Sequence, residues 1–172
     1  PVGFGGRKLP DGEGPKYKNT SDAAEYYSKS DVLYGLHWAK AEAGRLDELV
    51  VCEGYTDVIG CHLAGIERAV ATCGTALTPS HARLIGRFAR RVVLAFDADG
   101  AGQAAAERVY AWEEEFGLRF AVAALPEGAD PGDMARSDPD GLGRAIAEAR
   151  PFLEFRVDRA LGRGDLDTME GR

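Results

Sequence analysis

Val92-Val93-Leu94-Ala95-Phe96-Asp97-Ala98-Asp99-Gly100 is the stretch that decides the fold, because an unbroken apolar run ends there in two acids and a glycine. A run that is apolar at every position, rather than at alternate ones, is typical of a parallel strand buried on both faces. Leu49-Val50-Val51-Cys52-Glu53-Gly54 repeats this pattern earlier in the chain. Ligands of open α/β sheets lie at the carboxyl ends of the strands, so Glu53, Asp97 and Asp99 are expected to converge on one edge.

The segments around these two runs alternate between strand and helix patterns. Thr78-Pro79, for example, places an N-cap residue directly before a proline that suits the first helical position. Such alternation predicts an α/β fold with a mostly parallel sheet, right-handed crossovers and flanking helices. The expected strands are 48–52, 69–72, 91–96 and 118–125, and the expected helices are about 55–64, 79–89 and 100–116.

The rest of the chain divides at two boundaries. Residues 1–47 are expected to hold loops, short strands and one helix that begins at Ser30-Asp31 and runs to about Ala43. Residues 48–137 form the α/β unit, including a loop around Pro126–Gly132. Residues 138–172 are expected to be a helical segment with helices around 139–149 and 151–162, followed by a frayed tail.

Bulk properties exclude several classes of protein. The chain has 172 residues, of which 45% are hydrophobic and 28% are charged, and its net charge is −7. These values are ordinary for a globular domain, and the sequence lacks an apolar run long enough to span a membrane. The three cysteines have no C-x-x-C spacing, which argues against a zinc site and favours small buried thiols in a reducing cytoplasm. The start Pro1-Val2-Gly3 reads as that of an excised domain.

The acids carry the expected chemistry. Glu53, Asp97 and Asp99 would repel one another unless a cation joined them, and hard oxygen ligands favour Mg²⁺. Asp57 follows Glu53 by four residues, so it is either a further ligand or a negative charge that suits a helix N-terminus. Asp99 has a second interpretation as a helix cap. Asp130-Pro131-Gly132-Asp133 follows another strand and adds a third acid cluster, although Asp-Pro-Gly is also an ordinary turn.

Two motifs carry a resemblance to a known family. Glu53-Gly54-Tyr55-Thr56-Asp57 and Asp97-Ala98-Asp99-Gly100-Ala101-Gly102 resemble the paired acidic motifs of Toprim domains, which bacterial primases, topoisomerases and some nucleases share. Further motifs resemble the bacterial replicative primases of the DnaG type: Phe4-Gly5-Gly6-Arg7, Pro15-Lys16-Tyr17-Lys18-Asn19, Leu33-Tyr34-Gly35-Leu36 and Gly74-Thr75-Ala76-Leu77-Thr78.

The resemblance implies the Toprim part of a central RNA polymerase domain, together with the end of the preceding subdomain. Catalytic Mg²⁺ or Mn²⁺ would be bound by Glu53, Asp97 and Asp99, with Asp57 and the loop at Asp130 nearby. Glu53 would be a ligand, a general base, or both. The positions that would contact nucleotide or template are Arg7, Lys16, Asn19 and Lys29. One departure is that primases commonly carry Asp-Pro-Asp in the third loop, where this chain has Gly132 before Asp133.

The implied function is synthesis of short RNA primers on a single-stranded DNA template from nucleoside triphosphates, in the bacterial cytoplasm. The partners would be template DNA, RNA primer and a replicative helicase, the last through a C-terminal module absent here. The fragment is expected to be a monomer and poorly active alone. The alternatives are a non-catalytic Toprim scaffold, a topoisomerase or nuclease Toprim domain, and a haloacid-dehalogenase-type phosphatase with Asp97 as nucleophile. Ala101 is not the Thr or Val that the phosphatase motif requires.

Overall fold

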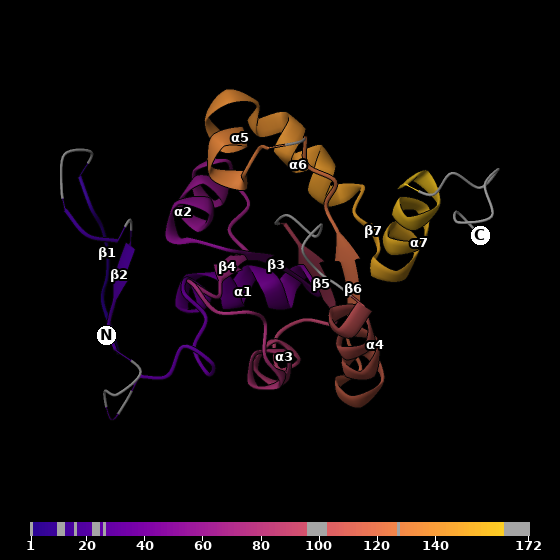
Figure 1. Ribbon diagram of the computed structural model, residues 1–172, viewed down its shortest axis with the longest axis horizontal. Coiled ribbons are helices and arrows are strands. Elements are labelled where there is room, and N and C mark those ends of the chain that lie inside the picture. Colours follow the sequence, from indigo (N-terminus) through magenta and orange to yellow (C-terminus); the bar gives the residue numbers. More distant parts are fainter. Residues whose placement is uncertain are drawn as a thin grey trace.

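A five-stranded sheet forms the centre of the molecule (Figure 1). The computed structural model describes residues 2–9, 13–15, 17–21, 25, 27–95, 103–126 and 128–163. The strand order is β4-β3-β5-β6-β7, and all neighbours pair in parallel except β6 and β7. The strands are β3 (Glu48–Cys52), β4 (Ala69–Ala71), β5 (Arg91–Leu94), β6 (Arg119–Val122) and β7 (Arg150–Pro151). The predicted mostly parallel α/β fold is confirmed.

Helices cover both faces of this sheet (Figure 1). One face carries α1 (Leu36–Leu46), α3 (Pro79–Ile85), α4 (Gln103–Phe116) and α7 (Phe152–Arg163). The opposite face carries α2 (Tyr55–Leu63), α5 (Pro131–Ser137) and α6 (Pro139–Ala147). Side chains alternate along β3, so Leu49 and Val51 face the first layer while Val50 and Cys52 face the second. Both layers are apolar, which explains why the strand sequences do not alternate with polar residues.

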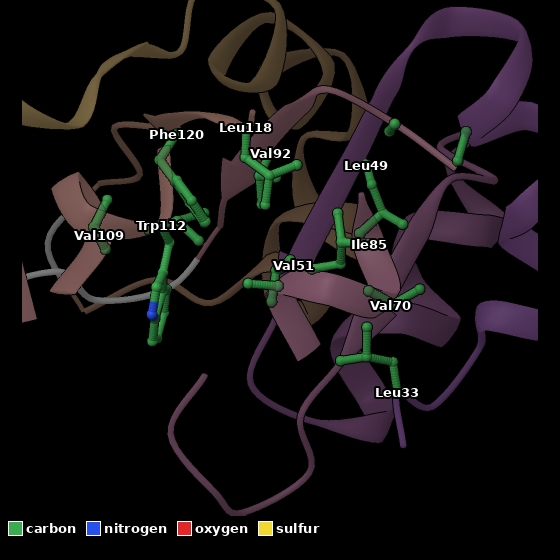
Figure 2. Close-up of a cluster of buried hydrophobic side chains, with 14 of the residues drawn as sticks. Leu33, Leu49, Val51, Val70, Ile85, Val92, Val109, Trp112, Leu118 and Phe120 are labelled. Atoms are coloured by element: carbon green, nitrogen blue, oxygen red, sulfur yellow. The ribbon is translucent and has the colours of Figure 1, made fainter. Parts of the chain in front are cut away.

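The larger hydrophobic cluster lies between the sheet and the first layer of helices. Figure 2 shows Leu49 and Ile85 on one side of this cluster, Phe120 and Trp112 on the other, and Val92 between them. Phe120 is 2% exposed, and its ring lies 6.4 Å from the Trp112 ring. Burying side chains of this size contributes about 1.5–3 kcal/mol each to folding. This cluster fixes the sheet that positions the acidic residues.

The two edges of the sheet are closed differently. At the β4 edge, Tyr34 pairs with Ala71 through two backbone hydrogen bonds of 2.9 and 3.0 Å. At the other edge, the two-residue strand β7 pairs antiparallel with β6, with Pro151 opposite Ala121. Outside this sheet, β1 (Gly5–Arg7) and β2 (Tyr17–Asn19) form an antiparallel hairpin, called here the N-terminal hairpin.

Several expected elements differ from the structure: the helix expected over about 79–89 ends at Ile85, and the strand expected over 118–125 ends at Val122. The helix expected from Ser30-Asp31 begins instead at Leu36, because Tyr34 gives its backbone groups to Ala71 and Gly35 has a left-handed φ of 86°. The expected loop around Pro126–Gly132 is shorter, because α5 begins at Pro131. Among the described residues, every helix is too short or too polar to span a membrane.

Candidate active site

Glu53 follows β3 directly and is exposed at the carboxyl end of that strand. Gly54 adopts an extended conformation and is the N-cap of α2. The Glu53 carbonyl oxygen accepts a 3.0 Å hydrogen bond from the Cys73 amide. Cys73 has a left-handed φ of 52°, which few residues other than glycine adopt. The backbone of Glu53 is therefore held by a loop that follows the neighbouring strand β4.

Asp57 lies one helical turn after Glu53 and is buried, with 7% of its surface exposed. Its Oδ2 accepts a 2.9 Å hydrogen bond from the Gly54 amide, so the side chain at the third helical position bonds back to the N-cap amide of α2. Burial raises the pKa of the Asp57 carboxyl, and the nearby charges of Asp130 and Asp133 add to that rise. Hydrogen bonds from the Gly54 and Gly132 amides lower the pKa and offset part of the effect. Asp57 thus joins α2 to the start of α5.

Asp130 and Asp133 lie at the N-terminus of α5. Asp130 is the N-cap, and its Oδ1 accepts a 2.6 Å hydrogen bond from the Asp133 amide. The Asp133 carboxylate pairs with Arg136 one turn further along the helix. Gly132 lies directly against Asp57: a Cβ at Gly132 would be 3.2 Å from Asp57 Oδ1. A longer side chain at position 132 would crowd Asp57, which accounts for glycine at this point of the third acidic loop.

The other predicted site residues are basic side chains near the N-terminus and the two acids that follow β5. Arg7 is exposed on β1, and Lys29 is half-buried in the segment before α1. The Lys29 carbonyl accepts a hydrogen bond from His81 Nε2 at 2.8 Å, so α3 fixes this part of the backbone. Asp97, Asp99 and Lys16 lie outside the described residues. Among the described residues, no three side chains of His, Cys, Asp or Glu are grouped so that they could hold a metal ion.

Asn19 lies on the N-terminal hairpin but contacts the loops beside Glu53. Its Nδ2 donates to the Cys73 carbonyl at 3.1 Å, and its Oδ1 accepts from the Tyr55 hydroxyl at 2.9 Å. The contributions of Tyr55 and Cys73 to this site have no signal in the sequence, because 36 and 54 positions separate them from Asn19. The site therefore joins the N-terminal hairpin, the start of α2 and the loop after β4.

Two family models match different parts of this chain. The family model described as Toprim-like matches residues 50–135, which is half of the chain. The chain belongs to the Toprim-like family. A second model, described as the N-terminal domain of the DNA primase catalytic core, matches residues 1–40 of this Toprim-like chain. Its N-terminal hairpin and its α/β unit therefore match different family models.

Individual relatives support the same relationship. The Toprim-like chain is 43% identical to a DNA primase of Streptomyces coelicolor over 178 residues, which cover 99% of the chain and 28% of the relative. It is similar to the RNA polymerase domain of Mycobacterium tuberculosis primase DnaG, with a TM-score of 0.80, 35% identity, and coverage of 95% of this chain and 56% of that one. It is also similar to a DnaG primase catalytic domain bound to ssDNA, with a TM-score of 0.80, 32% identity, and coverage of 99% and 54%. The resemblance to DnaG-type primases is confirmed, and the chain spans less than a third of that curated relative.

Proposed function

We propose that this chain is part of a DNA primase that synthesises short RNA primers on single-stranded DNA. The observation that carries the proposal is the position of Glu53, exposed at the carboxyl end of β3, within a chain that matches a primase N-terminal domain followed by a Toprim-like domain. Ligand sites of open α/β sheets lie at this edge. A solved relative, a DnaG primase catalytic domain bound to ssDNA, supports single-stranded DNA as the template.

A divalent cation, Mg²⁺ or Mn²⁺, fits the residues at this edge. Glu53 would hold it together with Asp97 and Asp99, and Asp57 and Asp130 would supply further carboxylate oxygens. Two of these carboxylates approach the same point: a Cβ at Gly132 would lie 3.2 Å from Asp57 Oδ1 and 3.3 Å from Asp130 Oδ1, and such paired oxygen ligands suit a hard cation. When bound, such an ion would lower the pKa of an attacking hydroxyl and screen charge on phosphate.

The reaction would join a primer 3′-hydroxyl to the α-phosphate of a nucleoside triphosphate, with release of pyrophosphate. Arg7, Lys16 and Lys29 would bind triphosphate or template backbone, and Asn19 would lie in the same part of the site. Contacts of this kind make binding sensitive to salt. The longer protein would act as a cytoplasmic enzyme at the replication fork, with a replicative helicase binding a module outside this chain. The fragment itself would be monomeric.

Charge-removing variants of the complete primase test the proposal. Asp97→Asn, Asp99→Asn and Glu53→Gln are each expected to lower primer synthesis by about 100-fold or more, since each removes a charge from the proposed metal site. Asp140→Asn, at an exposed position on α6, is the matched control and should retain full synthesis. Normal synthesis by the Asp97 and Asp99 variants would contradict the proposal.

Binding to the 172-residue chain provides a separate measurement. Calorimetric titration with Mn²⁺ should detect binding that weakens in Glu53→Gln and is unchanged in Asp140→Asn. Equal Mn²⁺ affinity in both variants would remove Glu53 from the proposed ligand set. The chain alone is expected to make little or no primer, and robust synthesis by it would contradict that expectation.

A further inference from the structure

The side-chain amide of Asn19 makes two hydrogen bonds across the site. Its Nδ2 donates to the Cys73 carbonyl and its Oδ1 accepts from the Tyr55 hydroxyl. The opposite orientation of the amide would place Oδ1 against the Cys73 carbonyl oxygen, and two acceptors cannot share a hydrogen bond. The position of that carbonyl therefore fixes the amide. Asn19 lies at the end of β2, opposite Gly5 of β1.

The Cys73 peptide connects this amide to Glu53. The Cys73 amide donates to the Glu53 carbonyl at 3.0 Å, while its own carbonyl accepts from Asn19. Cys73 holds a φ of 52°, and Gly74 follows with a φ of 93°. A residue other than glycine in this conformation costs about 1–3 kcal/mol and persists only where its surroundings hold it. Hydrogen bonds on both sides of Cys73 supply that restraint.

Tyr55 connects the same amide to the start of α2, two residues after Glu53. Its ring meets the Tyr34 ring edge-on, with centroids 4.7 Å apart and an interplanar angle of 87°. A side chain at Gly5 would overlap the Tyr55 ring, so the hairpin lies directly on this tyrosine. Asn19 is thus bonded to Tyr55, two residues after Glu53, and to the Cys73 peptide, which bonds to the Glu53 carbonyl.

We propose that Asn19 is a positioning residue, which holds Glu53 in a fixed place relative to the N-terminal hairpin that carries Arg7. The proposal rests on the proposed function and assigns Asn19 an indirect role in the reaction. Without the two hydrogen bonds, Cys73 loses one of its restraints and the Glu53 loop shifts against the hairpin. Small displacements of a catalytic group cost rate even when substrate binding is unchanged.

Three variants of the complete primase separate this role from direct contact with nucleotide. Tyr55→Phe keeps the ring but removes the hydroxyl, which bonds to Asn19 and to the Cys73 side chain. Asn19→Asp replaces the donor to the Cys73 carbonyl with an acceptor, and Asn19→Ala removes both bonds of the amide. Each should lower kcat for primer synthesis by about tenfold and leave KM for nucleoside triphosphate within about twofold. The double variant Asn19→Ala, Tyr55→Phe should be no slower than Asn19→Ala alone, because both changes remove the same link.

Thr20→Val is the matched control. Thr20 accepts a 2.8 Å hydrogen bond from the Phe4 amide within the hairpin and takes no part in the link to Cys73. It should keep kcat within about twofold of the unmodified enzyme. A rise in KM for nucleoside triphosphate with unchanged kcat in Asn19→Ala would show direct nucleotide binding and overturn the proposal. Unchanged kinetics in Tyr55→Phe would also overturn it.

Hydrogen exchange of the Cys73 amide gives a second readout that does not depend on primer synthesis. Protection of this amide should fall by about tenfold in Asn19→Ala and Tyr55→Phe but not in Thr20→Val, because only the first two release the loop. Unchanged protection in the first two variants would overturn the proposal whatever their activity. If the unmodified protein made no primer but both variants still lost protection of the Cys73 amide, the link would be established and the proposed function rejected.

Discussion

Gly60 of α2 and Gly132 of α5 face each other so closely that a Cβ on Gly60 would lie 3.0 Å from the Gly132 Cα. The same Cβ would lie 3.0 Å from the Ala135 Cβ. Small residues on both helices therefore set the distance between α2 and α5. That distance brings the Gly132 amide to Asp57 and places Asp130 and Asp133 near it.

Gly60→Ala should destabilise the chain despite the higher helix propensity of alanine. Helix propensity alone would stabilise by about 1 kcal/mol, but overpacking of a close helix contact costs about 1–3 kcal/mol. Gly143→Ala in α6 is the matched control, since a Cβ there meets no described atom within 4 Å. Urea unfolding should give a lower free energy of unfolding for Gly60→Ala and an equal or higher one for Gly143→Ala. Equal gains in both variants would refute the close packing of the two helices.

Glu48 should contribute to stability at the amino end of β3, opposite the acidic edge. Its carboxylate pairs with Arg68 at 2.7 Å and with Arg91, and its side chain is only 12% exposed. Glu48→Gln leaves two arginines without their anion and should lower the free energy of unfolding by about 2 kcal/mol, less than for a fully buried pair. Asp158→Asn breaks an exposed pair with Arg150 and should cost less than about 0.5 kcal/mol. Similar losses in the two variants would contradict this difference.

His81 should make stability depend on pH. Burial lowers the pKa of His81, and hydrogen bonds to the Lys29 and Val32 carbonyls, together with the negative charge of Asp31, offset part of that effect. Its Nδ1 accepts from the Thr78 amide at 3.3 Å, a hydrogen bond that protonation would remove. The unfolded chain therefore binds a proton more readily than the folded chain does. Stability should be complete above the unfolded value of about 6.5 and fall as pH drops below it.

His81→Gln is the variant that tests this origin of the pH dependence. The glutamine amide retains a donor that reaches toward the Lys29 carbonyl but does not titrate. Unfolding free energies measured between pH 7.5 and 5.5 should fall in the unmodified chain and stay nearly level in the variant. A fall of equal size in both proteins would assign the effect to other groups.

Phe120→Ala should be among the most destabilising single changes. Phe120 is 2% exposed between the sheet and the first layer of helices, beside Trp112 (Figure 2). Truncation leaves a cavity and should cost about 3–5 kcal/mol. Phe4→Ala, at a position 81% exposed, should change the free energy of unfolding by less than about 0.5 kcal/mol. Chemical unfolding of both variants measures the difference, and a small loss in Phe120→Ala would contradict the assignment of the core.

The strands were predictable because both faces of the sheet are covered, which leaves an unbroken apolar signal in β3 and β5. The start of α1 was not predictable in this way. Ser30-Asp31 is a plausible helix start, and it is the pairing of Tyr34 with the distant Ala71 that delays the helix to Leu36. The start of α5 was missed for a local reason, since Asp-Pro-Gly suits both a turn and a helix with Asp130 as N-cap.

The candidate site was only partly accessible to sequence reasoning. The acids could be identified because each follows an apolar strand, and their roles as ligands remain predictions. The link from Asn19 to Tyr55 and Cys73 depends on how the hairpin lies on the α/β unit, which no local pattern encodes. The close approach of Gly132 to Asp57 likewise depends on the crossing of two helices.

The closed edges of the sheet bear on how the chain behaves in concentrated solution. Unpaired backbone groups on an edge strand recruit strands from other molecules and start aggregation. Here β4 is only three residues long and Tyr34 already binds Ala71, while β7 is two residues long and includes Pro151, which has no amide hydrogen to offer. Both margins therefore discourage strand addition by a second molecule.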